Sequence, residues 1–219
     1  MNLKIYSICY ILINLFGIIT GNECTIIVKI TESGSYKIYE KPPNELYINN
    51  AKYEIQSSKF YQLNETNNII LLKYDNLDNC KKMFSGCSNI EEIDFSNCDT
   101  SSVTTMDRMF LGCSQLNSIN LLNIDTSEVT NMNCMFKQCG SLVSLDLSNF
   151  NTSKVEAISD MFRYCSSLTS LNLNSFDTSK VTNMGNMFWK CSSLIYLDLS
   201  NFNTSLNKNF GHMLLIVQN

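Results

Sequence analysis

The sequence is short of the residues on which most enzyme sites depend. Its 219 residues include one histidine, His212, and one tryptophan, Trp189, which leaves little material for imidazole chemistry. It has no Cys-x-x-Cys pair, no Gly-x-Ser-x-Gly motif and no glycine loop of the kind that cradles phosphate. We therefore expect no enzyme activity, no catalytic residue, no cofactor and no metal site, and a hydrolase that uses His212 is the least favoured alternative.

Charge is also scarce. Charged residues make up 16% of the chain, and the net charge is −4 with a pI near 5.0. A protein that binds phosphate backbones needs a basic surface, so we expect no nucleic-acid partner. Apolar residues make up 44%, which is enough for a sizeable core and argues against disorder.

Long apolar runs are missing except at the N-terminus. Residues 5–19 form an apolar run behind Lys4, and small residues follow, so we interpret 1–21 as a signal peptide. The run is shorter than the ~20 residues of a membrane span, although an uncleaved anchor is the alternative. Glu23 before Cys24 does not fit a lipoprotein signal. The predicted location is secreted or at the cell surface, with membrane contact only through residues 1–21 if they are retained.

What the chain has in abundance is a strict internal repeat. Met-Phe pairs begin at positions 83, 109, 135, 161 and 187, which is an interval of 26 residues each time. Two other kinds of residue keep the same interval. They are the cysteines Cys87, Cys113, Cys139, Cys165 and Cys191, and the Thr-Ser pairs that begin at Thr100, Thr126, Thr152, Thr178 and Thr204. Several columns in register indicate a stack of equivalent coils.

One unit, beginning at Cys139, shows the expected local structure. Leu142, Leu145 and Leu147 give the pattern Leu-x-x-Leu-x-Leu, which predicts an inward-facing strand. Residues 151–153 are typical helix caps. Val155, Ile158, Met161 and Phe162 then follow at spacings that predict a short helix. Because one unit cannot bury enough apolar surface alone, we expect the units to fold by stacking.

These residues resemble the BspA-like leucine-rich repeat family in its 26-residue variant. Residues 176–184 and 192–205 carry the resemblance most closely, and it covers about residues 77–205. The resemblance implies an α/β leucine-rich-repeat solenoid, with a parallel sheet on one face and short helices on the other. It also implies a secreted or surface protein used in adhesion, with no catalytic residues to carry over.

The flanks do not share the period. Residues 22–75 hold segments rich in Ile, Val and Tyr, interrupted by Pro42 and Pro43, and we predict a small β-rich N-terminal cap there. An unrelated domain on a linker is the alternative. The repeats are then about five units over 76–205, and 206–219 is an irregular tail.

Ten cysteines in a secreted chain suggest disulfides, but their repeat positions suggest core thiols. We expect the five in the repeated column, together with Cys80 and Cys98, to be buried thiols. Cys134 is expected to be exposed, and Cys24 has no assignment.

The outward residues of the predicted strands form the candidate partner-binding surface. They lie in two columns on the same face. The first is Glu92, Ser118, Ser144, Ser170 and Tyr196, and the second is Asp94, Asn120, Asp146, Asn172 and Asp198. Amides between the carboxylates relieve repulsion along the second column. The alternative is a solvated face that serves only solubility.

From these features we expect a secreted or cell-surface protein that mediates protein–protein or adhesion contacts. Its predicted partner is a protein or glycan ligand at the cell surface or in the extracellular matrix. The alternative is a structural spacer or coat component that associates with itself and has no specific ligand; the sequence leaves the oligomeric state open.

Overall fold

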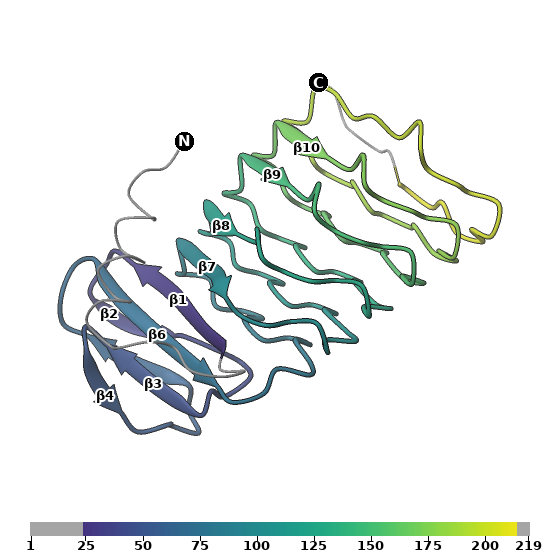
Figure 1. Cartoon of the computed structure of the whole chain (residues 1–219). Helices are drawn as coiled ribbons and strands as arrows, with labels where there is room; N and C mark the ends of the chain where they lie inside the picture. The colour runs from purple at the N-terminus through teal and green to yellow at the C-terminus, as the bar shows by residue number, and fades with distance from the viewer. Residues whose placement is uncertain (1–23, 214–219) are drawn as a thin grey trace.

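The computed structural model describes residues 24–213, and the predicted signal peptide at 1–21 lies outside this range. The described residues form ten β-strands and no helix (Figure 1). The first six strands are β1 (Cys24–Ile30), β2 (Gly34–Lys37), β3 (Glu45–Ile48), β4 (Ala51–Tyr53), β5 (Phe60–Leu63) and β6 (Asn68–Tyr74). The other four are β7 (Glu92–Asn97), β8 (Ser118–Asn120), β9 (Ser144–Asp146) and β10 (Ser170–Asn172).

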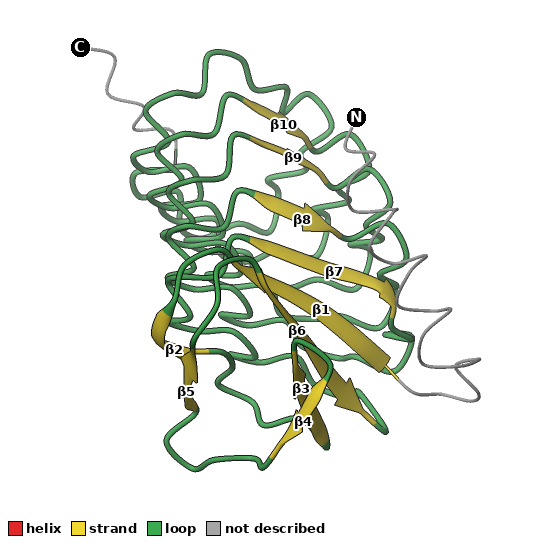
Figure 2. Cartoon of the chain, turned by 90° about the vertical axis from the view of Figure 1, so that its left-hand side faces the viewer, coloured by secondary structure: helices red, strands yellow, loops and turns green. Residues whose placement is uncertain are grey.

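Strand β1 joins the N-terminal unit to the repeats. It pairs antiparallel with β6 on one side and with β7 on the other, within a six-stranded sheet of order β4-β3-β6-β1-β7-β8. Pairs β9–β10 and β2–β5 form two separate two-stranded sheets. Figure 2 shows β6, β1 and β7 to β10 following one another along one face of the molecule.

The repeats form coils that lie one behind another after the N-terminal unit (Figure 1). Equivalent phenylalanines stack between neighbouring coils, with ring centroids 5.9, 5.3, 5.9 and 5.7 Å apart from Phe84 to Phe188. The predicted inward leucines are buried: Leu142, Leu145 and Leu147 are 1%, 6% and 0% exposed. The buried apolar residues form one cluster from Cys24 to Met213, so the N-terminal unit and the coils share a core.

The predicted α/β leucine-rich-repeat solenoid is wrong. The fold is all-β over the described residues, with no short helices on the far side of the coils. The strands divide into one six-stranded and two two-stranded sheets, and not into the continuous parallel sheet that the solenoid required. Between these short strands the coils consist of turns.

The missing helix at residues 155–162 has a local cause. Its three-residue spacing comes from successive turns, in which the N–H of Val155 donates to the carbonyl of Thr152 and that of Met161 to the carbonyl of Ile158. Asp160 and Tyr164 have φ of 57° and 64°, in the left-handed region, and such residues cannot continue a right-handed helix. Thr152 does not cap a helix either, because its hydroxyl is bonded to the backbone of Asp177 in the next coil.

Backbone hydrogen bonds between coils replace the helical ones. In each turn segment alternate N–H groups donate to carbonyls of the next coil, as from Arg108 to Asn133 and from Phe110 to Met135, both at 2.9 Å. Three or four such bonds are made by each described turn segment at equivalent positions, so they form parallel files along the stack. Every N–H in these files points toward the C-terminal end.

The cysteines fall into three groups. The repeated column is confirmed as buried thiols, and each thiol from Cys113 on donates to a phenylalanine carbonyl one coil back, as Cys139 Sγ does to Phe110 at 3.2 Å. Cys98 was wrongly expected to be a thiol, because it forms a disulfide with Cys24 that ties β1 to the end of β7. Cys134 was wrongly expected to be exposed and is 8% exposed.

Candidate functional site

The ten candidate residues lie on or beside strands β7 to β10, on what we call the sheet face. Register brings them together in pairs, with Glu92 beside Ser118 and Asp94 beside Asn120. Ser144 likewise lies beside Ser170, and Asp146 beside Asn172. Tyr196 and Asp198 follow in the next coil, where the described backbone has no strand.

The end of this face nearest the N-terminal unit is occupied. Lys29 of β1 forms an ion pair with Glu92 at 2.7 Å. Asp94 is only 5% exposed, and its Oδ1 accepts bonds from the Ser96 N–H and from Asn120 Nδ2. Glu92 therefore ties the first coil to the N-terminal unit and Asp94 ties the first coil to the second, and both carboxylates are poorly placed to contact a partner.

The column of Asp and Asn residues has a structural role in every coil. Each side-chain Oδ1 accepts the N–H two residues ahead, as Asp146 does from Ser148 at 3.0 Å and Asn172 from Asn174 at 3.1 Å. Bonds from Ser200 lower the pKa of Asp198 in the same way. Asn172 Nδ2 also lies 3.5 Å from Asp146 Oδ1, which is the contact expected of an amide between carboxylates. One oxygen of each carboxylate is thus already hydrogen-bonded within its own turn.

The open part of the sheet face is hollowed. One hollow, of about 380 Å³, lies between β8 and β9, where the two sheets of the coils meet without pairing. A second, of about 360 Å³, lies over β9 and β10 and is bounded by Tyr196. Ser144, Leu145 and Asp146 line both hollows, so the two are continuous, and together they are called the sheet-face groove.

The groove brings together seven of the ten candidate residues. They are Ser118, Asn120, Ser144, Asp146, Ser170, Asn172 and Tyr196. Asp146 is the one carboxylate among the lining residues, and the rest of the polar lining is hydroxyl and amide. Tyr196 is 75% exposed. Such a surface can form many directional hydrogen bonds beside one aromatic ring.

Several lining residues were not among the candidates, and Leu122 and Asn149 are two of them. Leu122 lines the first hollow and is 66% exposed, at a repeat position where other units have Ser96, Ser148, Asn174 and Ser200. Asn149 lines the same hollow, and its Nδ2 donates to the carbonyl of Leu121 in the preceding coil at 2.9 Å. A leucine at a repeat position that is otherwise serine or asparagine was the signal that marked Leu122 as unusual.

Two features are absent from the described part of the chain. Residues 24–213 contain no helix with the length and apolar character to cross a membrane. In the same range, no three His, Cys, Asp or Glu side chains are grouped so that they could hold a metal ion.

The fold and groove define a repeat protein of stacked β-coils with a polar groove on one face. A family model described as "Mycoplasma protein of unknown function, DUF285" matches this chain over residues 56–146, 78–193 and 137–218. The second of these matches alone covers more than half of the chain, so the chain belongs to the DUF285 family. No curated protein and no solved structure matches. The resemblance to BspA-like leucine-rich repeats was therefore wrong, since a different family matches and the described residues have no helices.

Proposed function

We propose that the chain is a secreted or cell-surface binding protein that holds a protein or glycan partner in the sheet-face groove and so mediates adhesion. The observation that carries the proposal is a continuous groove lined by hydroxyl and amide groups and ending at an exposed tyrosine. Binding sites combine a concave surface with a few directed polar groups, and tyrosine is enriched among the residues that dominate binding energy.

The Cys24–Cys98 disulfide supports the proposed location. Disulfides persist in oxidising compartments, outside the cell or along the secretory route. The sequence pattern of residues 1–21 favours the same route. Neither observation depends on the groove, so the location and the binding site are supported separately.

The test starts from the full-length chain, applied to arrays of glycans and extracellular matrix proteins. The tightest partner is then measured by calorimetry against Tyr196→Ser and Asp146→Asn. Asparagine keeps the Oδ1 that accepts the Ser148 N–H, so Asp146→Asn removes charge without removing the turn. We expect Tyr196→Ser to weaken binding about tenfold or more, because an aromatic residue that dominates binding contributes about 2 kcal/mol.

Two matched controls lie off the groove. Phe60→Ser removes an aromatic ring that is 49% exposed in β5, and Asp177→Asn alters a carboxylate that accepts the Ser179 N–H in the same kind of turn. We expect less than a twofold change from either control. Equal weakening by the control and groove variants would refute the proposal. So would a chain that binds nothing on the arrays but assembles with itself as its concentration rises, which would favour a self-associating spacer.

A further inference from the structure

The basic residues of the coils are gathered on one surface. Each coil has a turn segment away from its strand, and five such segments (81–86, 107–112, 133–138, 159–164 and 185–190) form what we call the turn face. It carries six cations: Lys81, Lys82, Arg108, Lys137, Arg163 and Lys190. It has two carboxylates, Asp107 and Asp160, and therefore a net charge of +4. The rest of residues 79–213 has three cations and ten carboxylates, so charge is segregated between faces.

Each of the two carboxylates holds a pair of cations from adjacent coils. Asp107 lies 3.5 Å from Lys81 and 2.6 Å from Arg108. Asp160 lies 3.1 Å from Lys137 and 2.8 Å from Arg163. Burial opposes ionisation of Asp160, but the bonds from Arg163 and Lys137 outweigh it, so its pKa is lowered. Each group of three keeps a net positive charge and fixes its cations in position.

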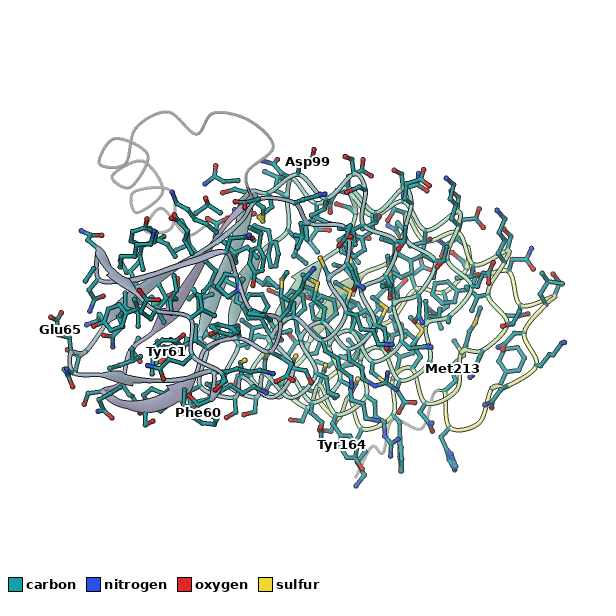
Figure 3. All side chains as sticks on the ribbon, turned by 90° about the horizontal axis from the view of Figure 1, so that it is seen from below. Phe60, Tyr61, Glu65, Asp99, Tyr164 and Met213 are labelled. Atoms are coloured by element: carbon teal, nitrogen blue, oxygen red, sulfur yellow. A yellow bond between two sulfur atoms is a disulfide. The ribbon has the colours of Figure 1, made fainter. Side chains whose placement is uncertain are left out.

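Aromatic rings accompany the cations toward the C-terminal end of the turn face. The Arg163 guanidinium lies 4.1 Å from the ring centroid of Trp189, and Lys190 Nζ lies 5.3 Å from that of Tyr164. The His212 ring stacks on Trp189 at 5.4 Å. Cations over ring faces are held electrostatically, which orders these long side chains before any partner arrives. Tyr164 projects at the edge of the molecule opposite Asp99 in Figure 3.

We propose that the turn face is a second binding surface, separate from the sheet-face groove, and that it binds a linear acidic polysaccharide. The cations recur roughly once per coil, and the stacked phenylalanines put neighbouring coils 5.3–5.9 Å apart. A sugar ring advances a polysaccharide by a similar distance, so one carboxylate or sulfate per ring meets one cation per coil. Cations and His212 occupy faces of the Tyr164 and Trp189 rings, and the parts of these rings that stay exposed offer apolar contact to a sugar between the charges.

The charge spacing argues against a nucleic acid as the partner. Duplex DNA carries a negative charge about every 1.7 Å along its axis, several times denser than one cation per coil. The net charge of −4 on the whole chain would also repel such a polyanion outside the turn face. A polysaccharide with one acid group per ring matches the spacing of the cations on the turn face. It does not bring additional negative charge close to the acidic sides of the coils.

The test compares two triple variants of the full-length chain that lose the same charge. Lys82→Gln, Lys137→Gln and Lys190→Gln remove three cations from the turn face. Lys154→Gln, Lys180→Gln and Lys208→Gln remove the three cations of the coils that lie elsewhere. The probes are heparin, polygalacturonate, neutral dextran, single-stranded DNA and phosphatidylserine vesicles, each measured by calorimetry at several salt concentrations.

We expect heparin and polygalacturonate to bind the unaltered chain with an affinity that falls as salt rises, and dextran not to bind. The turn-face triple should weaken binding about tenfold or more and the control triple less than twofold, with the unfolding midpoint of both within a few degrees of the unaltered chain. Equal weakening by both triples, or binding of neither polysaccharide at low salt, would overturn the proposal. Tighter binding of DNA or of the vesicles than of the polysaccharides would overturn it as well. Variants of the sheet-face groove should leave this binding unchanged, so the two proposals fail independently.

Discussion

The buried threonines that begin the repeated Thr-Ser pairs offer the sharpest test of how the coils hold together. We call them the threonine column; they are Thr100, Thr126, Thr152 and Thr178. Thr152 is 2% exposed, and its hydroxyl bridges to the next coil: Oγ1 accepts the Asp177 N–H at 2.7 Å and donates to the Asp177 carbonyl at 3.0 Å. Thr152→Val keeps the shape of the side chain and removes both bonds. Two backbone groups of Asp177 are then left without partners.

The magnitude follows from those two groups. A buried polar group that loses its partner costs about 1–3 kcal/mol, and because the Asp177 side chain is exposed, water reaches part of this backbone. We therefore expect the lower end of this range for each group, so that Thr152→Val lowers the free energy of unfolding by about 2 kcal/mol in total. The free energy of unfolding of a typical domain is roughly 5–15 kcal/mol. Thr152→Ser retains the hydroxyl and should lose only about 1 kcal/mol from the missing methyl group.

Urea unfolding of the full-length chain, followed by far-ultraviolet circular dichroism, measures these differences. The matched control is Thr130→Val, because Thr130 is exposed and its hydroxyl makes a single 3.3 Å bond to the carbonyl of Thr104. We expect a loss below about 0.5 kcal/mol for the control. A loss from Thr152→Val that is no greater than that from Thr130→Val would refute the role given to the threonine column.

Two further predictions concern the cysteines. Replacing Cys24 and Cys98 together by serine opens a loop with a sequence separation of 74 residues, so urea unfolding should show a loss of about 4 kcal/mol, and an unchanged midpoint would contradict this. Burial raises the pKa of the Cys80 and Cys191 thiols from 9.0 to about 12. A raised pKa in the folded state means that stability is full below pH ~9 and is lost as pH rises toward ~12. Replacing Cys191 by alanine should therefore flatten the alkaline limb of stability against pH, and a limb of unaltered slope would count against thiol ionisation as its cause.

The sequence revealed the packing of the coils better than their backbone. Equivalent apolar positions were correctly predicted to face inward. When equivalent units stack, the side chains at one repeat position all have the same surroundings. The helix was wrongly predicted because turns that repeat every three residues resemble one face of a helix over a short stretch. A true helical face alternates three- and four-residue steps, whereas Val155, Ile158 and Met161 follow one another at three-residue steps and only Phe162, four residues after Ile158, supplies the other step.

The sequence also held a signal for where the predicted helical segment must end. Gly86 and Gly112 occupy the repeat position that Gln138, Tyr164 and Lys190 hold in later units, and all five have positive φ. Glycine at one position of a repeat in two units indicates a left-handed residue there, which ends a helix. The later units have a residue with a side chain at this position, so their sequence does not reveal the left-handed backbone. There the contacts between coils compensate for the strain of a side chain at positive φ.

The candidate site was partly predictable for the same reason. The structure places the residues of the two columns along one face, but nothing in the sequence indicated that β1 would pair with β7. That long-range contact buries Asp94 and engages Glu92, and it also brings Cys24 to Cys98. The cations of the turn face were not predicted as a group because they occupy different repeat positions in different coils. Only the fold brings them to one surface.

The direction of the backbone files bears on whether the chain works alone or by stacking end to end. At the N-terminal edge the files end in carbonyls, and the N-terminal unit meets them with donors: Lys41 Nζ to Asn79 at 2.6 Å, the Glu40 N–H to Met83 at 2.7 Å and Lys37 Nζ to Ser85 at 2.7 Å. That edge is therefore closed to a second copy. A second copy could stack on this edge only by displacing the N-terminal unit from those carbonyls, which argues against a self-associating spacer that grows in this direction.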